Sequence, residues 1–189
     1  MPTINGKVCV VNGVPVDKVF SNGKQIYGRN IITKTSADLQ TSPYSHSNST
    51  GGFIHYFISD ELIHLAGNKV TTRTFIHNTT THTVNLVMWT NYGGISVGTD
   101  VLAGTDGYST ITNYSIASNS DTWGNITIRA YADNAEINGV PYKEFKLEKG
   151  SVVTPWSPAP EDVLNGYIAA PRNLKETVID LNSVKLDWE

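Results

Sequence analysis

The sequence predicts an all-β protein folded as a sandwich or a barrel, and three observations lead to this fold class. Runs of four to nine residues rich in β-branched and aromatic side chains recur along the chain. Each run is bounded by Gly, Asn, Asp or Ser, which favour tight turns. The sequence lacks a sustained helical period, and residues 59–65 alone favour a helical turn, with Ser59 or Asp60 as its cap.

Residues 1–28 are predicted to form an N-terminal arm of β-hairpins. The turn signals are Asn5-Gly6, Asn12-Gly13 and Asn22-Gly23. Asn-Gly is the strongest signal for a two-residue hairpin turn, because both residues tolerate a positive φ. An arm of this size is too small to bury a core of its own. We therefore expect it to pair with a partner chain or to lie on the main domain.

Residues 29–150 are predicted to form the main β-sandwich. Its expected strands are residues 53–58, 70–77, 84–89, 108–116, 126–132 and 144–147. In the fifth of these, alternation with period two directs Ile126 and Ile128 to the core, and Arg129 and Tyr131 to the opposite face. Arg129 and Tyr131 are then available for an outer surface of the sheet.

Residues 151–173 are predicted to be an exit linker, because four prolines lack a backbone donor and fix φ. Neither a helix nor a central strand is expected there. Trp156 is expected to close the base of the sandwich by packing. Residues 174–189, which include Trp188, resemble the first two strands of a fibronectin type III domain. Two strands do not fold alone, so this tail either docks elsewhere or belongs to a longer protein.

The composition argues against several classes of partner. Charged residues make up 16% of the 189-residue chain, below the roughly 25% of typical soluble domains. The net charge is -3 and Lys and Arg do not cluster, so neither nucleic acid nor an anionic membrane is an expected partner. Cys9 is the only cysteine, which excludes an intrachain disulfide and a zinc site built on cysteines. No secretion signal is recognised, and no apolar run reaches the roughly 20 residues of a membrane helix.

Motifs of catalysis and metal binding are missing from the sequence. The histidines form neither the His-x-x-x-His nor the His-Glu-x-x-His spacing of zinc hydrolases. No Gly-x-Ser-x-Gly nucleophile turn and no Gly-rich phosphate loop occurs. A glycosidase needs two carboxylates facing each other across a sugar, and the sequence alone pairs none of its 17 acidic residues in this way. We expect no catalytic residue, no enzyme activity and no metal ligand among these motifs.

Saccharide binding makes demands that this sequence meets. A pyranose is held by an exposed aromatic ring and a few planar hydrogen-bonding groups. Such groups cluster in residues 89–94, in residues 121–125 and on the outer side of residues 126–133. The candidate contact residues are Trp89, Asn91, Tyr92, Trp123, Arg129 and Tyr131. The alternatives stay open, since either tryptophan can belong to the core and Arg129 and Tyr131 can form an ordinary solvated face.

Two segments that bracket the main domain carry a family resemblance. Residues 19–32 read VFSNGKQIYGRNII and residues 146–162 read KLEKGSVVTPWSPAPED. Both resemble the ends of small β-sandwich modules in tail and baseplate proteins of phages that infect Gram-positive bacteria. The resemblance spans residues 19–162 and implies a jelly-roll fold like that of carbohydrate-binding modules. It also implies host cell-wall saccharides as partners, without a fixed motif of binding residues.

The expected function is that of a non-enzymatic virion protein of a phage tail, baseplate or head fibre, which binds saccharides of a Gram-positive host and assists adsorption. The resemblance allows a structural calcium ion, with Glu148 or Asp133 as a ligand, and no other cofactor. Other virion proteins are expected to contact the arm and the tail, and homo-oligomerisation stays open.

The alternative function is a structural connector or oligomerisation module that binds protein and not sugar. An exposed ring of Trp89 or Trp123 favours sugar, whereas burial of both favours the connector. A third alternative, a glycan-degrading enzyme, needs a pair of carboxylates in a cleft.

Overall fold

The computed structural model describes residues 8–11, 14–41, 53–57, 64–119, 124–133, 135–137 and 139–164. The N-terminal part forms two short antiparallel pairs, in which β1 (Val10–Val11) pairs with β2 (Val14–Pro15), and β3 (Lys18–Ser21) pairs with β4 (Lys24–Gly28). The main body contains β5 (Gln40–Thr41), β6 (Phe53–Phe57), β7 (Lys69–His77), β8 (Asn85–Thr90), β9 (Gly94–Val97), β10 (Asp106–Ser115), β11 (Gly124–Arg129) and β12 (Pro141–Lys149). A short helix, α2 (Pro160–Leu164), follows.

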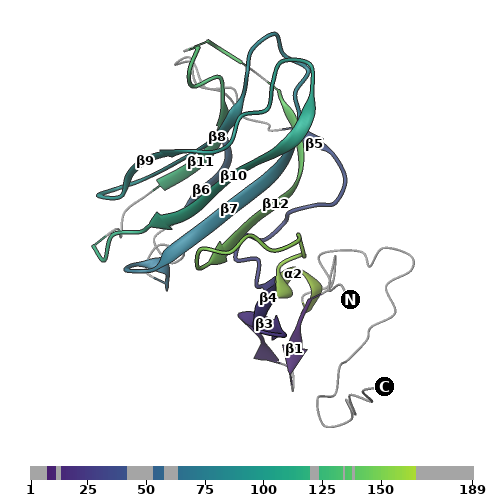
Figure 1. Ribbon diagram of the computed structural model, residues 1–189, viewed down its shortest axis with the longest axis vertical. Helices are drawn as coiled ribbons and strands as arrows, with labels where there is room; N and C mark the ends of the chain where they lie inside the picture. The colour runs from purple at the N-terminus through teal and green to yellow at the C-terminus, as the bar shows by residue number, and fades with distance from the viewer. Residues whose placement is uncertain are drawn as a thin grey trace.

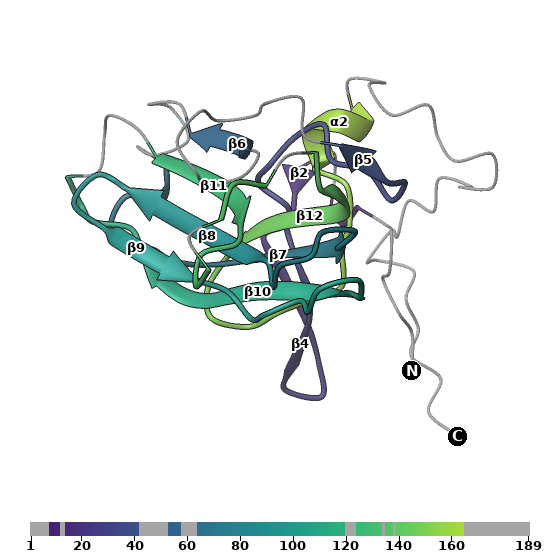
Figure 2. The same ribbon diagram turned by 90° about the horizontal axis from the view of Figure 1, so that it is seen from above.

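Two four-stranded antiparallel sheets face each other in the main body (Figure 1). The first sheet has the strand order β10-β7-β12-β5, and the second has the order β6-β11-β8-β9. Figure 2 shows the two layers from above, with the β3–β4 hairpin projecting from them. The predicted all-β sandwich is therefore confirmed. None of the helices in the described part of the chain is long and apolar enough to span a membrane.

The core lies between the two sheets and is built by alternate residues of each strand. The second sheet contributes Leu86, Met88, Ile126 and Ile128, all of them fully or almost fully buried. The first sheet contributes apolar residues together with inward threonines. Thr72 donates a hydrogen bond to the carbonyl of Lys146 (3.0 Å), next to the point where the β7–β12 register shifts. The threonine hydroxyl thus finds an acceptor inside the core at an irregularity of the ladder.

Most of the expected strands are present, and the differences have local causes. The strand expected at residues 126–132 ends at Arg129, because Ala130 makes an isolated bridge to Ala135 and residues 131–133 form a turn. Strand β9 was not expected, because its four residues, with Gly94 and Ser96, are too few to show a clear alternation of apolar and polar side chains. Of the predicted helical turn at residues 59–65, only His64 and Leu65 lie within the described residues, and both are helical. The tail at residues 174–189 lies outside the described residues, and the division into arm, sandwich and linker stays a prediction.

Helix α2 corrects the expectation that residues 151–173 contain no helix. Pro160 stands at the first position, where no backbone donor is needed, and acidic residues occupy the first turn. Asp162 accepts a hydrogen bond from the backbone N–H of Lys34 (2.7 Å), and Glu161 pairs with Arg29. The helix is therefore fastened to the chain that follows β4.

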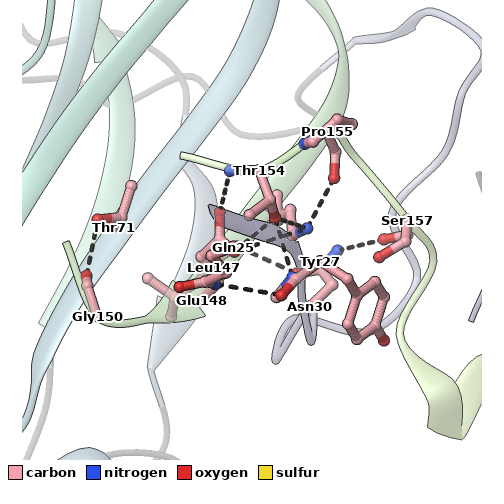
Figure 3. A network of polar contacts seen from close by, with 12 residues as sticks. Gln25, Tyr27, Asn30, Thr71, Leu147, Glu148, Gly150, Thr154, Pro155 and Ser157 are labelled. Atoms are coloured by element: carbon pink, nitrogen blue, oxygen red, sulfur yellow. Dashed lines mark hydrogen bonds and ion pairs between the residues drawn. The ribbon is translucent and has the colours of Figure 1, made fainter. Parts of the chain in front are cut away.

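The base of the sandwich holds a cluster of buried polar side chains, which we call the base network: Asn30, Lys146, Glu148 and Thr154. Figure 3 labels Asn30, Glu148 and Thr154 of this cluster. The Thr154 hydroxyl accepts hydrogen bonds from the Gly28 N–H (3.1 Å) and from Nζ of Lys146 (2.7 Å), and it donates to Oε2 of Glu148 (2.7 Å). The Thr154 N–H donates to Oε1 of Glu148 (2.9 Å). This hydroxyl uses its one donor and both acceptor sites.

Lys146 and Glu148 form an ion pair removed from water. They are 1% and 2% exposed, and Nζ of Lys146 lies 3.8 Å from Oε2 of Glu148. Nζ also donates to the carbonyl of Pro155 (2.7 Å). Burial lowers the pKa of Lys146 to about 8, and the negative charge of Glu148 opposes this shift. The two buried charges therefore depend on hydrogen bonds with the exit segment, residues 151–162, which occupy their remaining donors and acceptors.

Asn30 joins the other strands of the base. Its Oδ1 accepts hydrogen bonds from the N–H groups of Ile32 (3.2 Å) and Leu147 (3.1 Å). Its Nδ2 donates to the carbonyls of Phe145 (3.1 Å) and Ser157 (3.2 Å). One fully buried amide thus connects the chain after β4, strand β12 and the exit segment. Trp156 is also buried, as expected, and donates to the Thr35 hydroxyl (3.2 Å).

Gly28→Ala is expected to lower the free energy of unfolding by about 2 kcal/mol or more, because overpacking a filled site is destabilising. The added Cβ would lie 1.7 Å from Oε2 of Glu148. Gly107→Ala is the matched control, since its Cβ would meet Val101 at 3.6 Å, an ordinary contact. Urea unfolding measures both variants. Equal free energies of unfolding for the two variants would show that the base network rearranges around the added methyl group at little cost.

The pKa of Lys146 predicts a pH dependence of stability. Its folded value of about 8 lies below the roughly 10.4 of an unfolded lysine, so the unfolded chain binds more protons between these values. The free energy of unfolding should therefore rise from pH 7.5 to 9.5, relative to a Lys146→Met/Glu148→Gln double variant in which neither residue titrates. Urea unfolding across this range checks the difference. A constant difference would mean that Lys146 titrates normally.

Candidate functional site

The second sheet turns one row of side chains from each central strand away from the core. These residues are Asn85, Val87 and Trp89 on β8, and Asn125, Thr127 and Arg129 on β11; we call them the outer face. Because β8 and β11 are antiparallel neighbours in direct register, the row is ordered Arg129 beside Asn85, Thr127 beside Val87, and Asn125 beside Trp89. Strand β9 extends the face with Ile95 beside Trp89 and Val97 beside Val87.

Arg129 is fixed on the outer face by a threonine. Its Nε donates to Oγ1 of Thr127 (2.9 Å), two residues away on the same strand. Burial lowers the pKa of Arg129, although the nearby Tyr131 opposes this shift. Within the described residues its terminal nitrogens make no hydrogen bond to protein. The guanidinium is thus partly desolvated and oriented, with donors left for another molecule.

Two buried amide oxygens of the outer face have no partner. Asn85 is 3% exposed and Asn125 is 6% exposed, and Oδ1 of each lacks a hydrogen bond among the described residues. Nδ2 of Asn85 donates to Oδ1 of Asp100 (2.8 Å), which fixes the amide. Buried acceptors are nearly always paired in folded proteins, because an unpaired one costs its desolvation free energy. Both oxygens are shielded from solvent, and Val87 and Thr127 between them are fully buried as well.

The turn between β8 and β9 forms one end of the outer face. It contains Asn91 and the exposed Tyr92, whose φ of 62° lies in the left-handed region. Tyr114 holds this turn from behind, since its hydroxyl contacts Oγ1 of Thr90 (2.8 Å) and the carbonyl of Gly94 (2.7 Å). The turn therefore presents Tyr92 from a fixed backbone.

The predicted contact residues are spread along this face and do not meet at one point. Trp89 is half-buried and shares the face with Arg129. Arg129 lies four positions along β11 from Asn125, the neighbour of Trp89, which is about 13 Å. Tyr92 lies beyond the tryptophan, and the exposed Tyr131 follows Arg129 in a turn. The result is a track that is exposed toward its two ends and buried at Asn85, Val87, Asn125 and Thr127 between them, and not a pocket. Trp123 lies outside the described residues.

Three polar residues of the outer face are not among the predicted contact residues: Asn85, Thr127 and Asn125. Period two groups Asn85 with Trp89, and Thr127 with Arg129, so their shared face was predictable. The lack of a hydrogen-bond partner for the amide oxygens of Asn85 and Asn125 was not predictable, because it depends on which strand lies beside each residue in the sheet. No sequence pattern marks an unpaired amide.

The described residues contain no group of three or more His, Cys, Asp or Glu placed to hold a metal ion. Glu148, a calcium ligand implied by the resemblance, is instead engaged by Thr154 and Lys146 in the base network. The other one, Asp133, lies 3.5 Å from Nδ1 of His82. Asp100 brings one carboxylate to the outer face, where Oδ1 accepts the hydrogen bond from Asn85.

Comparison of the chain with models of known protein families, with curated proteins and with solved structures finds no match in any of the three. The segments that carry the resemblance, residues 19–32 and 146–162, build the β3–β4 hairpin, the base network and α2. They supply no residue of the outer face.

Asn125→Leu is expected to leave the free energy of unfolding unchanged or to raise it by up to about 1 kcal/mol, because it removes a buried oxygen without a partner. Thermal and urea unfolding measure the effect. Asn30→Leu is the contrasting control, since Oδ1 of Asn30 accepts two hydrogen bonds. A loss at Asn125 as large as that at Asn30 would assign the Asn125 amide a structural role.

Proposed function

We propose that this chain is a non-enzymatic saccharide-binding module of a phage particle, and that the outer face of its second sheet is the binding surface. The observation that carries the proposal is the combination on one face of an oriented arginine and a half-buried tryptophan, with exposed tyrosines near both ends of the face. The fold, the ligand and the biological setting are supported by separate observations.

A jelly roll is the fold that we propose for the sandwich. The pairs β8–β9, β7–β10, β6–β11 and β5–β12 are nested, so that eight strands follow one another as a long hairpin. Further pairing of β7 with β12 and of β8 with β11 distributes this hairpin over two sheets. This arrangement supports a jelly roll, which has eight strands in two sheets.

The outer face fits the chemistry of a sugar chain. Arg129 would donate hydrogen bonds to ring or hydroxyl oxygens, whereas Oδ1 of Asn85 and of Asn125 lies below the surface of the face. Trp89 would contact the apolar face of a ring, with Tyr92 and Tyr131 at the two ends of the track. An elongated track suits several consecutive residues of a polysaccharide.

The phage setting rests on the resemblance of residues 19–32 and 146–162. It supports a virion location on a tail, baseplate or head fibre, with the cell-wall polysaccharide of a Gram-positive host as partner. A shallow track gives modest affinity for each copy, and many copies on one particle would strengthen attachment through avidity.

A second candidate function, a connector that binds another virion protein, is favoured by the N-terminal hairpins. Val14 of β2 is 64% exposed and Phe20 of β3 is 60% exposed. Large apolar side chains at such positions are typical of contacts with another chain. The two functions are compatible, since the hairpins and the outer face lie on different elements.

Arg129→Gln is expected to weaken binding to purified wall polysaccharide of a Gram-positive host about tenfold or more, because charge-assisted hydrogen bonds are lost. Arg73→Gln is the matched control. Arg73 is also a half-buried arginine on a central strand, but it lies on the first sheet, 4.1 Å from the ring centroid of Tyr108.

Binding of fluorescently labelled protein, presented as an artificial multimer, to cells and to extracted polysaccharides of several strains measures both arginine variants. Equal effects of the two substitutions would contradict the outer face as the site. Absence of saturable binding to every strain would favour the connector.

A further inference from the structure

Strand β9 is an edge strand of the second sheet, and among the described strands only β8 lies beside it in that sheet (Figures 1 and 2). Just past β9, the N–H of Gly98 donates to the carbonyl of Leu86 on β8 (2.8 Å). Hydrogen-bonded positions alternate along an antiparallel ladder, so Ser96 also faces β8. The N–H and carbonyl groups of Ile95 and Val97 therefore point to the open side, where they bond to no described backbone group.

The open side of β9 lacks the features that normally protect a sheet edge. Such edges usually carry charged residues, proline or a bulge, because their unpaired backbone groups can add a strand of another molecule. Residues 93–99 read GGISVGT and contain neither a charge nor a proline. Strand β10, an edge of the first sheet, differs: its register with β7 shifts between Ile111 and Tyr114, and Asn113 adopts a φ of 61°. The fold thus interrupts the β10 edge and leaves the β9 edge regular.

The side chains that β9 adds to the outer face are apolar and exposed. Ile95 is 52% exposed and Val97 is 40% exposed. They continue the outer face past Trp89 and Val87, their neighbours on β8. Removing such side chains from water is favourable, in proportion to the apolar area buried. The β9 edge therefore offers backbone hydrogen bonds and apolar area to the same partner.

We propose that the open side of β9 is the contact surface for a second copy of this chain, whose own β9 pairs with it in antiparallel fashion. A two-fold axis at Ser96 places Ile95 of each copy opposite Val97 of the other. Both residues turn their backbone groups to the open side, so each such pair exchanges two hydrogen bonds.

A second copy fits this edge because residues 93–99 are neutral. Under two-fold symmetry a charged segment would meet like charges of its own copy, which is destabilising for residues directly opposite in a sheet. Here the apolar side chains of Ile95 and Val97 meet instead. Because β9 has only four residues, the contact is small and the dimer should dissociate on dilution.

Pairing of this kind joins two four-stranded sheets into one continuous sheet. An antiparallel pair keeps the same face of both copies on the same side, so the two outer faces lie next to each other. A polysaccharide that contacts both would gain avidity. The pairing itself does not depend on saccharide binding.

The test is sedimentation of the whole chain at concentrations up to about 1 mM, where weak association is detected. A reversible equilibrium between monomer and dimer is expected. Ile95→Lys should raise the dissociation constant about tenfold or more, because lysines block sheet edges. Val97→Pro should do the same, because proline removes an N–H on the open side, where an edge strand tolerates it. Leu39→Lys is the matched control, since Leu39 is 53% exposed outside this edge, and should have no effect.

Amide hydrogen exchange identifies the strand that pairs. Exchange at Ile95 and Val97 should slow about tenfold or more once most of the protein is dimeric. The N–H of Ser96 faces β8, so its exchange should not depend on protein concentration.

A chain that stays monomeric up to about 1 mM would overturn the proposal. A dimer with unchanged affinity in folded Ile95→Lys and Val97→Pro proteins would overturn it too, since the contact would then lie elsewhere. Thermal unfolding shows whether each variant is folded. The exchange of the Ile95 amide in the unaltered chain keeps the test decisive if Val97→Pro is unstable. Because the polysaccharide test depends on Arg129 and this one on the β9 edge, either proposal can fail alone.

Discussion

The structure depends on a lysine and a glutamate that are buried together at one end of the sandwich. Removing both charges from water is costly, and removing one partner alone would leave an uncompensated charge inside the protein. Lys146 and Glu148 are neighbours on β12, but Thr154 and Pro155 of the exit segment complete their hydrogen bonds. Gly28, at the end of β4, comes close enough to join them only because it has no side chain. The base network therefore fixes where the chain enters and leaves the sandwich.

This placement separates the base network from the proposed binding surface. The base network uses the chain around β4, one end of β12 and the exit segment, whereas the outer face uses β8 and β11. The unpaired amides of Asn85 and Asn125 are a local cost that the rest of the fold sustains. A module built in this way can change its ligand contacts without disturbing its base. It can also pair through the β9 edge independently of the base network.

The sequence was sufficient for the strands and insufficient for the contacts between them. Alternation of apolar residues located β7, β8 and β11 because each strand has one face in the core. It also grouped Arg129 with Thr127. It did not show that Tyr131 leaves the strand for a turn, nor that Pro160 begins a helix, because both depend on packing against other segments. The role of Lys146 was equally hidden, since a lysine in a strand normally indicates a solvated face.

The most direct test of the account is a nuclear magnetic resonance titration of the isotopically labelled chain with oligosaccharides cut from the wall polysaccharide of a Gram-positive host. We expect the Nε–H of Arg129 and the indole N–H of Trp89 to shift in a saturable way. Resonances of the base network should stay unchanged. Saturable shifts confined to the N-terminal hairpins or to the first sheet, with none on the outer face, would contradict it.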